Sequence, residues 1–191
     1  MVGAGLHNLP LELRPAVAAE PGHVLVRADL GQIEPRVLAA VSRDPALAAA
    51  ADTHDLDAPV ATRLGRDLRT HGGRLVRMGR PDDDDSDPDA ARRAAAARGR
   101  YGRNAVVQGA AAEMFKAWAA TVRARLAGSG AGIVLCLHDE LLVHAPEGDG
   151  DAIARLVDEC LLEAAARWRP PGPPVRFVAD VSVVRRWSDV R

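Results

Sequence analysis

Residues 24–29 read VLVRAD, and residues 133–144 read IVLCLHDELLVH. Short apolar runs rich in Val, Ile and Leu that end at polar residues are typical of buried strands. The first run predicts a strand that ends at Asp29. The second predicts two strands separated only by Asp139 and Glu140, which is the spacing of a tight hairpin with both carboxylates at its tip.

Helical patterns surround these strands. Residues 32–41 and 148–168 carry apolar residues at helical spacing. Residues 89–126 contain few helix breakers and should form one or two helices, with Gly99 and Gly102 marking the expected interruption. We expect a turn and a short strand over 70–78 and a last strand over 175–184. Helices and strands without strict βαβ alternation predict an α+β fold, with an antiparallel β-sheet backed by long α-helices.

The composition narrows the class of protein. The chain has 191 residues, of which 48% are hydrophobic, so it can bury one core and wholesale disorder is unexpected. No apolar run reaches the roughly 18–20 residues of a membrane span, and the first residues do not have the pattern of a secretory signal. Neither Cys136 nor Cys160 lies in a CxxC or His-rich setting, so we predict neither a disulfide scaffold nor a zinc site. A cytoplasmic protein is expected.

The charge is unevenly distributed. The formal net charge is −1, but six aspartates lie between residues 82 and 89, and without them the chain carries +5. We expect residues 80–90 to form a solvated, disordered acidic loop. The mildly basic remainder is compatible with nucleic-acid binding without requiring it.

Asp29 and Asp139 are the first candidates for chemistry. Adjacent central strands would bring their carboxylates together, and two such carboxylates repel each other unless a cation joins them. Hard oxygen ligands on a rigid sheet suit Mg²⁺, which completes its shell with water and substrate phosphates. From spacing alone, the alternative that each aspartate is a turn residue or a helix cap stays open.

Five blocks of sequence resemble the family A DNA polymerases, the bacterial DNA polymerase I type. Residues 29–36 (DLGQIEPR) resemble motif A, and residues 138–140 (HDE) between apolar strands resemble motif C. Residues 104–116 (NAVVQGAAAEMFK) resemble the palm helix, residues 6–10 (LHNLP) a segment upstream of motif A, and residues 177–181 (FVADV) the last strand. The blocks occur in the family's order. They are most similar to actinobacterial enzymes that pair an exonuclease domain with this polymerase module.

The resemblance implies a role for each matching residue. Asp29 and Asp139 would hold two Mg²⁺ ions, for which Mn²⁺ can substitute, with help from the Leu30 carbonyl. Glu140 is placed with them as a catalytic residue. The nucleotide pocket would include Gln32, Ile33 and Glu34, and Glu34 would act as a gate against a 2′-hydroxyl. Primer-template DNA would be contacted by Arg100, Asn104, Gln108 and His138. Arg14 and Arg36 would contact the DNA backbone or brace the acidic centre.

The sequence also departs from the family. We find no motif B, the fingers helix that holds the triphosphate, and the junction near residues 66–68 resembles a deletion. The upstream thumb is missing as well, and Asp57 stands where the family has His or Tyr. Losing the cationic contacts to the triphosphate removes positioning and charge neutralisation, which supply most of the catalysis in phosphoryl transfer.

The resemblance therefore implies a DNA-directed DNA polymerase palm spanning residues 1–191, acting on primer-template DNA and dNTPs in replication or repair. It implies a bacterial, nucleoid-associated protein without a membrane partner. We expect this chain alone to extend primers poorly or not at all. Three alternatives stay open: a non-catalytic DNA-binding remnant, one part of a split polymerase completed by another chain, and the inactive product of a truncated gene.

Overall fold

The computed structural model describes residues 11–42, 67–78, 88–168, 171–172 and 174–190. Their elements are η2 (Leu11–Ala16), β1 (His23–Leu30), α1 (Ile33–Ser42), β2 (Leu68–Arg69), β3 (Leu75–Val76), α3 (Pro88–Arg125), β4 (Gly132–Leu137), β5 (Glu140–Pro146), η3 (Glu147–Asp149), α4 (Gly150–Trp168), β6 (Ala179–Val184) and η4 (Trp187–Asp189). Within the described ranges, no helix combines the length and the apolar character needed to cross a bilayer.

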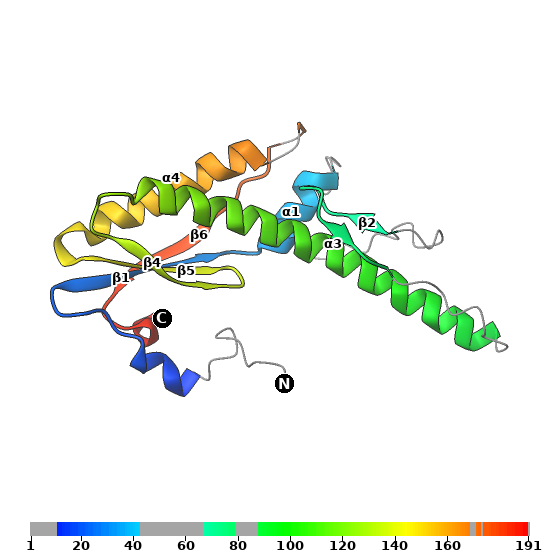
Figure 1. The fold of residues 1–191 in the computed structure, drawn as a ribbon, viewed down its shortest axis with the longest axis horizontal. Coiled ribbons are helices and arrows are strands. Elements are labelled where there is room, and N and C mark those ends of the chain that lie inside the picture. Colours follow the sequence, from blue (N-terminus) through cyan, green and yellow to red (C-terminus); the bar gives the residue numbers. More distant parts are fainter. Residues whose placement is uncertain (1–10, 43–66, 79–87, 169–170, 173, 191) are drawn as a thin grey trace. The chain divides into compact units, whose positions relative to one another are not determined.

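The chain divides into two compact units. The first contains a four-stranded antiparallel sheet in the order β4-β5-β1-β6, together with α4 and residues 114–125 of α3 (Figure 1). The second contains α1 after Ile33, the small β2–β3 hairpin and residues 88–113 of α3. The predicted α+β class, an antiparallel sheet with long helices, is confirmed.

Helices cover one face of the sheet in the first unit. Val24, Val26 and Ala28 alternate along β1 and are buried on this face. The indole N–H of Trp118 on α3 donates to the backbone carbonyl of Val157 on α4 at 3.0 Å, which joins the two helices over the sheet. A Cβ added at Gly150 would lie 3.0 Å from side-chain atoms of Val24 and Val183, so α4 begins in close contact with the sheet.

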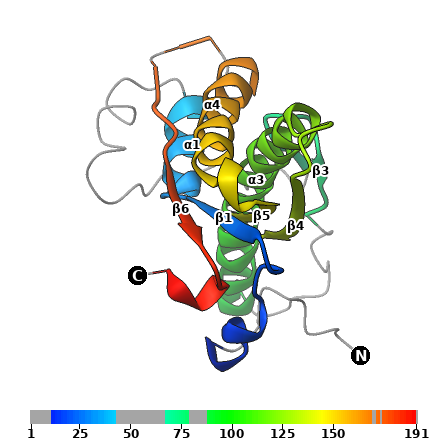
Figure 2. The same ribbon diagram turned by 90° about the vertical axis from the view of Figure 1, so that its left-hand side faces the viewer.

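The opposite face of β1 has a mixed character. It carries an apolar cluster in which Leu25, Leu142 and Trp187 are buried. Trp187 comes from η4, which lies beside η2 at the edge of this face (Figure 2). Further along the same face the side chains become charged, because Arg27 and Asp29 follow Leu25 at the two-residue period of a strand.

The hairpin between β4 and β5 differs from the prediction by one residue. The two turn residues are His138 and Asp139, while Glu140 pairs with Leu137 and is the first residue of β5. Only Asp139 therefore lies at the tip. Glu140 is drawn into the strand because it pairs with Asp29 of β1 and its carboxylate is bound by buried donors.

The predicted interruption of the long helix at Gly99 and Gly102 is wrong. Helix α3 runs unbroken for 38 residues. A Cβ at Gly102 would lie 2.5 Å from the Met78 side chain, and one at Gly109 would lie 2.6 Å from Thr70. Glycine at these two positions lets the Met78 and Thr70 side chains pack closely against α3. This packing offsets the modest helix penalty of glycine, about 1 kcal/mol per residue.

Three further boundaries differ from expectation. Helix α3 begins at Pro88, so the predicted acidic loop over 80–90 is wrong for its last residues, and residues 79–87 lie outside the described part. Residues 68–76 form two short strands rather than one. Strand β6 begins at Ala179, because residues 175–178 make no ladder with β1.

Candidate metal centre

Three carboxylates form a row across the sheet. The register places Asp29 of β1 opposite Glu140 of β5 on one side and opposite Asp180 of β6 on the other. Residues directly opposite each other in antiparallel strands point to the same face, and like charges in such positions are destabilising. The row therefore requires nearby positive charge.

Arg27 supplies one cation to this row. Its guanidinium donates to Asp29 Oδ2 at 2.7 Å and to Glu140 Oε1 at 2.8 Å, and lies 3.6 Å from Asp180 Oδ2. The Arg27 and Glu140 side chains are only 13% and 8% exposed, so this pair is largely shielded from water. Charge-assisted hydrogen bonds in such surroundings fix side-chain geometry more firmly than exposed ion pairs do.

Glu140 has a second donor. The indole N–H of Trp187 donates to Glu140 Oε1 at 2.5 Å. The guanidinium of Arg14 lies 4.5 Å from the centre of the Trp187 ring, within cation–π distance. Arg14, predicted to contact DNA or to brace the acidic centre, thus touches the residue that holds Glu140.

Asp139 reaches the same place from the β4–β5 turn. The backbone N–H of Leu30 donates to the carbonyl of Asp139 at 2.9 Å, so the segments that carry Asp29 and Asp139 meet at this bond. The strand that ends at Asp139 is β4, which is not adjacent to β1; β5, which follows Asp139, is the neighbour of β1. Asp139 is half-buried, whereas the neighbouring His138 is exposed.

The positive charge of Arg27 does not fully offset the burial and the negative charges around Asp29. Burial raises the pKa of the Asp29 carboxyl above its ordinary value; Arg27 opposes this shift, and the carboxylates of Asp139, Glu140 and Asp180 add to it. Three carboxylates thus pair with the guanidinium of Arg27, and Asp139 adds a further negative charge beside Asp29. Excess negative charge on oxygen ligands is the setting in which a divalent cation binds.

The donor set fits Mg²⁺ or Mn²⁺. The Asp29 side chain is 33% exposed, so a hydrated ion can reach it, and carboxylate oxygens are the ligands that these hard cations prefer. Asp29 and Asp139 are the candidate ligands for such an ion. Glu140 is less available, because Arg27 and Trp187 already bind one of its oxygens.

A cleft of about 480 Å³ opens beside the acidic row. Charged side chains and the Trp187 ring dominate its lining, so it is suited to polar molecules. Its lining residues are Arg14, Arg27, Asp29, Asp180, Trp187, Ser188 and Val190.

Gln32 and Ile33 follow Asp29 at the end of β1. Gln32 is exposed and has a φ of 53°, a left-handed conformation that is uncommon for a residue with a side chain. Such strain is concentrated at functional sites. Ile33 is buried at the start of α1, so its contribution to a nucleotide pocket would be to shape it.

The other predicted site residues belong to the second unit. Glu34 and Arg36 lie half-buried on α1. The row of Arg100, Asn104 and Gln108 is exposed along one face of α3, as the spacing of four predicts. An exposed row is available for contacts with a ligand.

Known proteins share the sequence pattern and the fold of this chain. The profile of DNA polymerase family A matches residues 59–189, which include Asp139, Glu140 and Asp180. The chain belongs to DNA polymerase family A. Asp29 lies ahead of the matched range, and its place in the site rests on its pairing with Glu140.

Two family A proteins show how much of a polymerase the chain spans. It is 30% identical over 92 residues to DNA polymerase theta of Caenorhabditis elegans, which is 48% of this chain and 6% of that protein. Its fold matches the POL domain of Pol1 from M. smegmatis, solved in complex with DNA primer-template and dNTP, with a TM-score of 0.71 and 23% identity. That match covers 96% of this chain and 44% of the other.

Sequence reasoning missed three residues of this acidic centre. Arg27, Asp180 and Trp187 lie in or beside the recognised blocks but were given no role. Arg27 carried a usable signal, because it interrupts an apolar strand at a position two residues before Asp29, on the same face. The contact between Trp187 and Glu140 joins residues 47 positions apart and left no local pattern.

Proposed function

We propose that this chain is the catalytic palm of a template-directed DNA polymerase, which transfers a nucleotide to a primer 3′-hydroxyl. The observation that carries the proposal is the backbone hydrogen bond that joins the end of β1, beside Asp29, to Asp139 in the β4–β5 turn, next to a carboxylate row that Arg27 only partly neutralises. The Pol1 POL domain with its bound primer-template and dNTP supports DNA and dNTP as ligands. We place the protein in the bacterial cytoplasm, at the nucleoid.

In the proposed reaction, the 3′-hydroxyl oxygen attacks the α-phosphorus of the dNTP. A new P–O bond forms, the bond to the bridging oxygen breaks, and pyrophosphate leaves while the hydroxyl proton passes to solvent. Two bound divalent ions would stabilise the attacking and the leaving oxygens. Asp29, Asp139 and the Leu30 carbonyl would hold them.

The other residues of the centre position these ligands. Arg27 and Trp187 hold Glu140, and Arg27 also fixes one oxygen of Asp29. Fixed ligands reduce the rearrangement required during reaction, which is a main source of catalysis in phosphoryl transfer. We assign Gln32, Ile33 and Glu34 to the nucleotide pocket, with Glu34 as the sugar gate.

The chain alone should be a weak polymerase. No motif B stands between motifs A and C in this sequence, so the triphosphate lacks its cationic clamp. A separate chain that supplies fingers would restore that clamp. The exposed Arg100, Asn104 and Gln108 row favours one second candidate, a non-catalytic DNA-binding module.

Primer extension on a primed DNA template, in Mg²⁺ and separately in Mn²⁺, tests the proposal. We expect at most slow addition of a few nucleotides, best in Mn²⁺ and abolished by Asp139→Ala. Asp158→Ala, at an exposed position on α4, is the matched control and should behave as the parent. Processive extension would overturn the predicted impairment.

Two results decide against the catalytic proposal. Extension that persists in Asp139→Ala would remove Asp139 from the chemistry. A folded protein that extends nothing and binds primed duplex equally with and without Mg²⁺ would support the DNA-binding module instead.

A further inference from the structure

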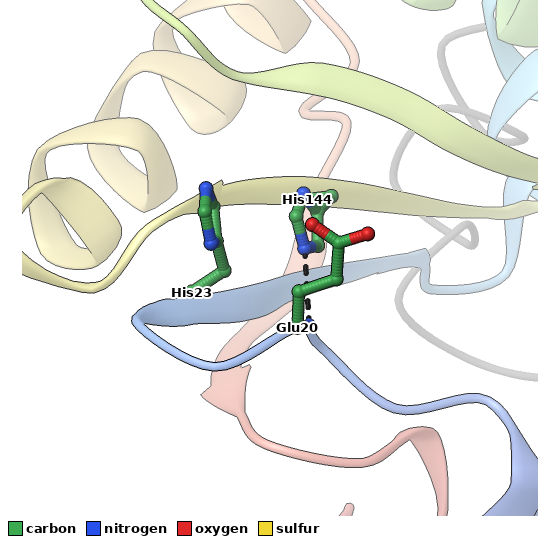
Figure 3. A group of neighbouring side chains, drawn as sticks. All are labelled: Glu20, His23 and His144. Atoms are coloured by element: carbon green, nitrogen blue, oxygen red, sulfur yellow. Dashed lines mark hydrogen bonds between the residues drawn. The ribbon is translucent and has the colours of Figure 1, made fainter.

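Two histidines lie together on the sheet face that also carries the acidic row. His23 is the first residue of β1, and His144 is on β5, opposite Leu25 (Figure 3). Their rings are stacked, with centroids 4.4 Å apart and planes 13° from parallel. His23 and Asp29 are six residues apart on β1, which is about 20 Å along a strand. The histidine pair is therefore separate from the acidic row.

Glu20 completes a group of three potential ligands. It precedes β1, and its carboxylate extends toward the His144 ring (Figure 3). One ligand atom from each of Glu20, His23 and His144 lies within 4.8 Å of the other two. Glu20 is exposed and both histidines are half-buried, so the group is open to solvent.

Hydrogen bonds prepare both rings as ligands. His23 Nδ1 lies 3.3 Å from the Pro21 carbonyl, which can only accept, so this contact favours the tautomer that presents Nε2 as the metal-binding nitrogen. A backbone carbonyl that orients the second nitrogen is the usual support of a metal-bound histidine. His144 Nε2 accepts the backbone N–H of Glu20 at 3.3 Å, which places its lone pair toward the Glu20 segment. This bond is long and therefore weak.

We propose that Glu20, His23 and His144 form a transition-metal site that binds Zn²⁺. Two imidazoles and a carboxylate are a common zinc ligand set, and three protein ligands leave the fourth tetrahedral position to water. Mg²⁺ prefers an all-oxygen shell, so the two ends of this sheet face discriminate between the two ions. Binding requires the stacked rings to turn until their lone pairs converge, and the metal replaces the long bond to His144.

Such a site would crosslink two segments of the chain. It joins the segment before β1 to the end of β5, which are distant in sequence. A ligand that binds only the folded chain raises its stability in proportion to the logarithm of ligand concentration. The proposal does not depend on polymerase activity, because none of its three ligands belongs to the acidic row.

Isothermal titration with Zn²⁺ in excess Mg²⁺ tests the site. Excess Mg²⁺ occupies oxygen ligands at the acidic row, and a Cys136→Ser background removes the exposed thiol. We expect one Zn²⁺ per chain. His23→Ala and His144→Ala should each weaken binding by at least about tenfold, since even an outer-shell change costs about 10–100-fold.

The matched control is His71→Ala, which removes an exposed histidine of the second unit and should bind Zn²⁺ as the parent does. Circular dichroism verifies that each variant is folded. Binding that is absent in the parent, or equal in the parent and both alanine variants, overturns the proposal.

A cobalt measurement gives an independent, positive signal. In the same background, His144→Cys retains three ligands, so Co²⁺ should give a thiolate-to-cobalt charge-transfer band. The band should vanish when His23→Ala is added. A band unaffected by His23→Ala would mean that the two positions do not share a metal.

Discussion

The acidic row on the sheet and the surface between α3 and α4 contain the same chemical groups in different surroundings. On the sheet, Arg27 binds Asp29 and Glu140, and its side chain is 13% exposed. On the helices, Arg125 binds Glu159 and Glu163, and its side chain is 46% exposed. Water screens the second set, whereas it hardly reaches the pair of Arg27 and Glu140. We therefore expect the ion pairs of Arg27 to contribute much more to the stability of the fold than those of Arg125.

Removing Arg27 should have the largest effect. Arg27→Met retains much of the apolar stem but leaves Glu140 buried beside Asp29 without its cation, which should cost about 3 kcal/mol of unfolding free energy. Urea unfolding measures the loss. Mg²⁺ should recover more stability in Arg27→Met than in the parent, because a bound cation replaces the missing charge.

The surface pair supplies the control for that experiment. Arg125→Met removes an arginine that also binds two carboxylates, and we expect a loss below about 1 kcal/mol. Adding Glu140→Gln to Arg27→Met should recover part of the loss, since it removes the stranded charge. Equal losses for the two arginine variants would contradict the comparison.

Neutralising Asp29 should have a smaller and opposite effect. Burial and neighbouring carboxylates raise the pKa of Asp29 in the folded protein, so ionising it opposes folding. The destabilisation caused by ionised Asp29 is absent below the unfolded-state pKa, near 3.8, and reaches its full size above the folded-state pKa. Asp29→Asn in EDTA should therefore gain stability at neutral pH and lose the gain as the pH falls toward 3.8.

The expected gain is below about 1 kcal/mol, because a third of the side chain is exposed and solvent screens it. Asp158→Asn, on exposed α4, should show no gain at any pH. Thermal unfolding across the pH range measures both variants. A loss of stability in Asp29→Asn at neutral pH would mean that Arg27 outweighs burial at this carboxyl.

The fold class could be predicted from the sequence, because short apolar runs and helical spacing without βαβ alternation indicate an antiparallel sheet with helices. The candidate aspartates end apolar runs, but their metal-binding role came from the family resemblance and not from their spacing. The hairpin was predicted one residue late, since the position of Glu140 depends on Arg27 and Trp187 rather than on local turn preferences. The unbroken α3 likewise depends on side chains that approach Gly102 and Gly109 from a distant hairpin.

The histidine pair shows the limit of local patterns. His23 and His144 are 121 positions apart, and only the register of β1 against β5 brings them together. Neither lies in a metal-binding sequence motif, so the sequence favoured no zinc site. Roles that require a bound molecule, such as those of Glu34 and the Arg100 row, stay predictions.

Manganese binding measured by electron paramagnetic resonance tests the central claim most directly, because it reports the metal centre without requiring fingers or thumb. The parent should bind Mn²⁺ in competition with Mg²⁺. Asp139→Asn should weaken that binding by at least about tenfold, while Asp158→Asn leaves it unchanged. Equal Mn²⁺ affinity in the parent and Asp139→Asn would contradict the assignment of the metal centre to Asp29 and Asp139.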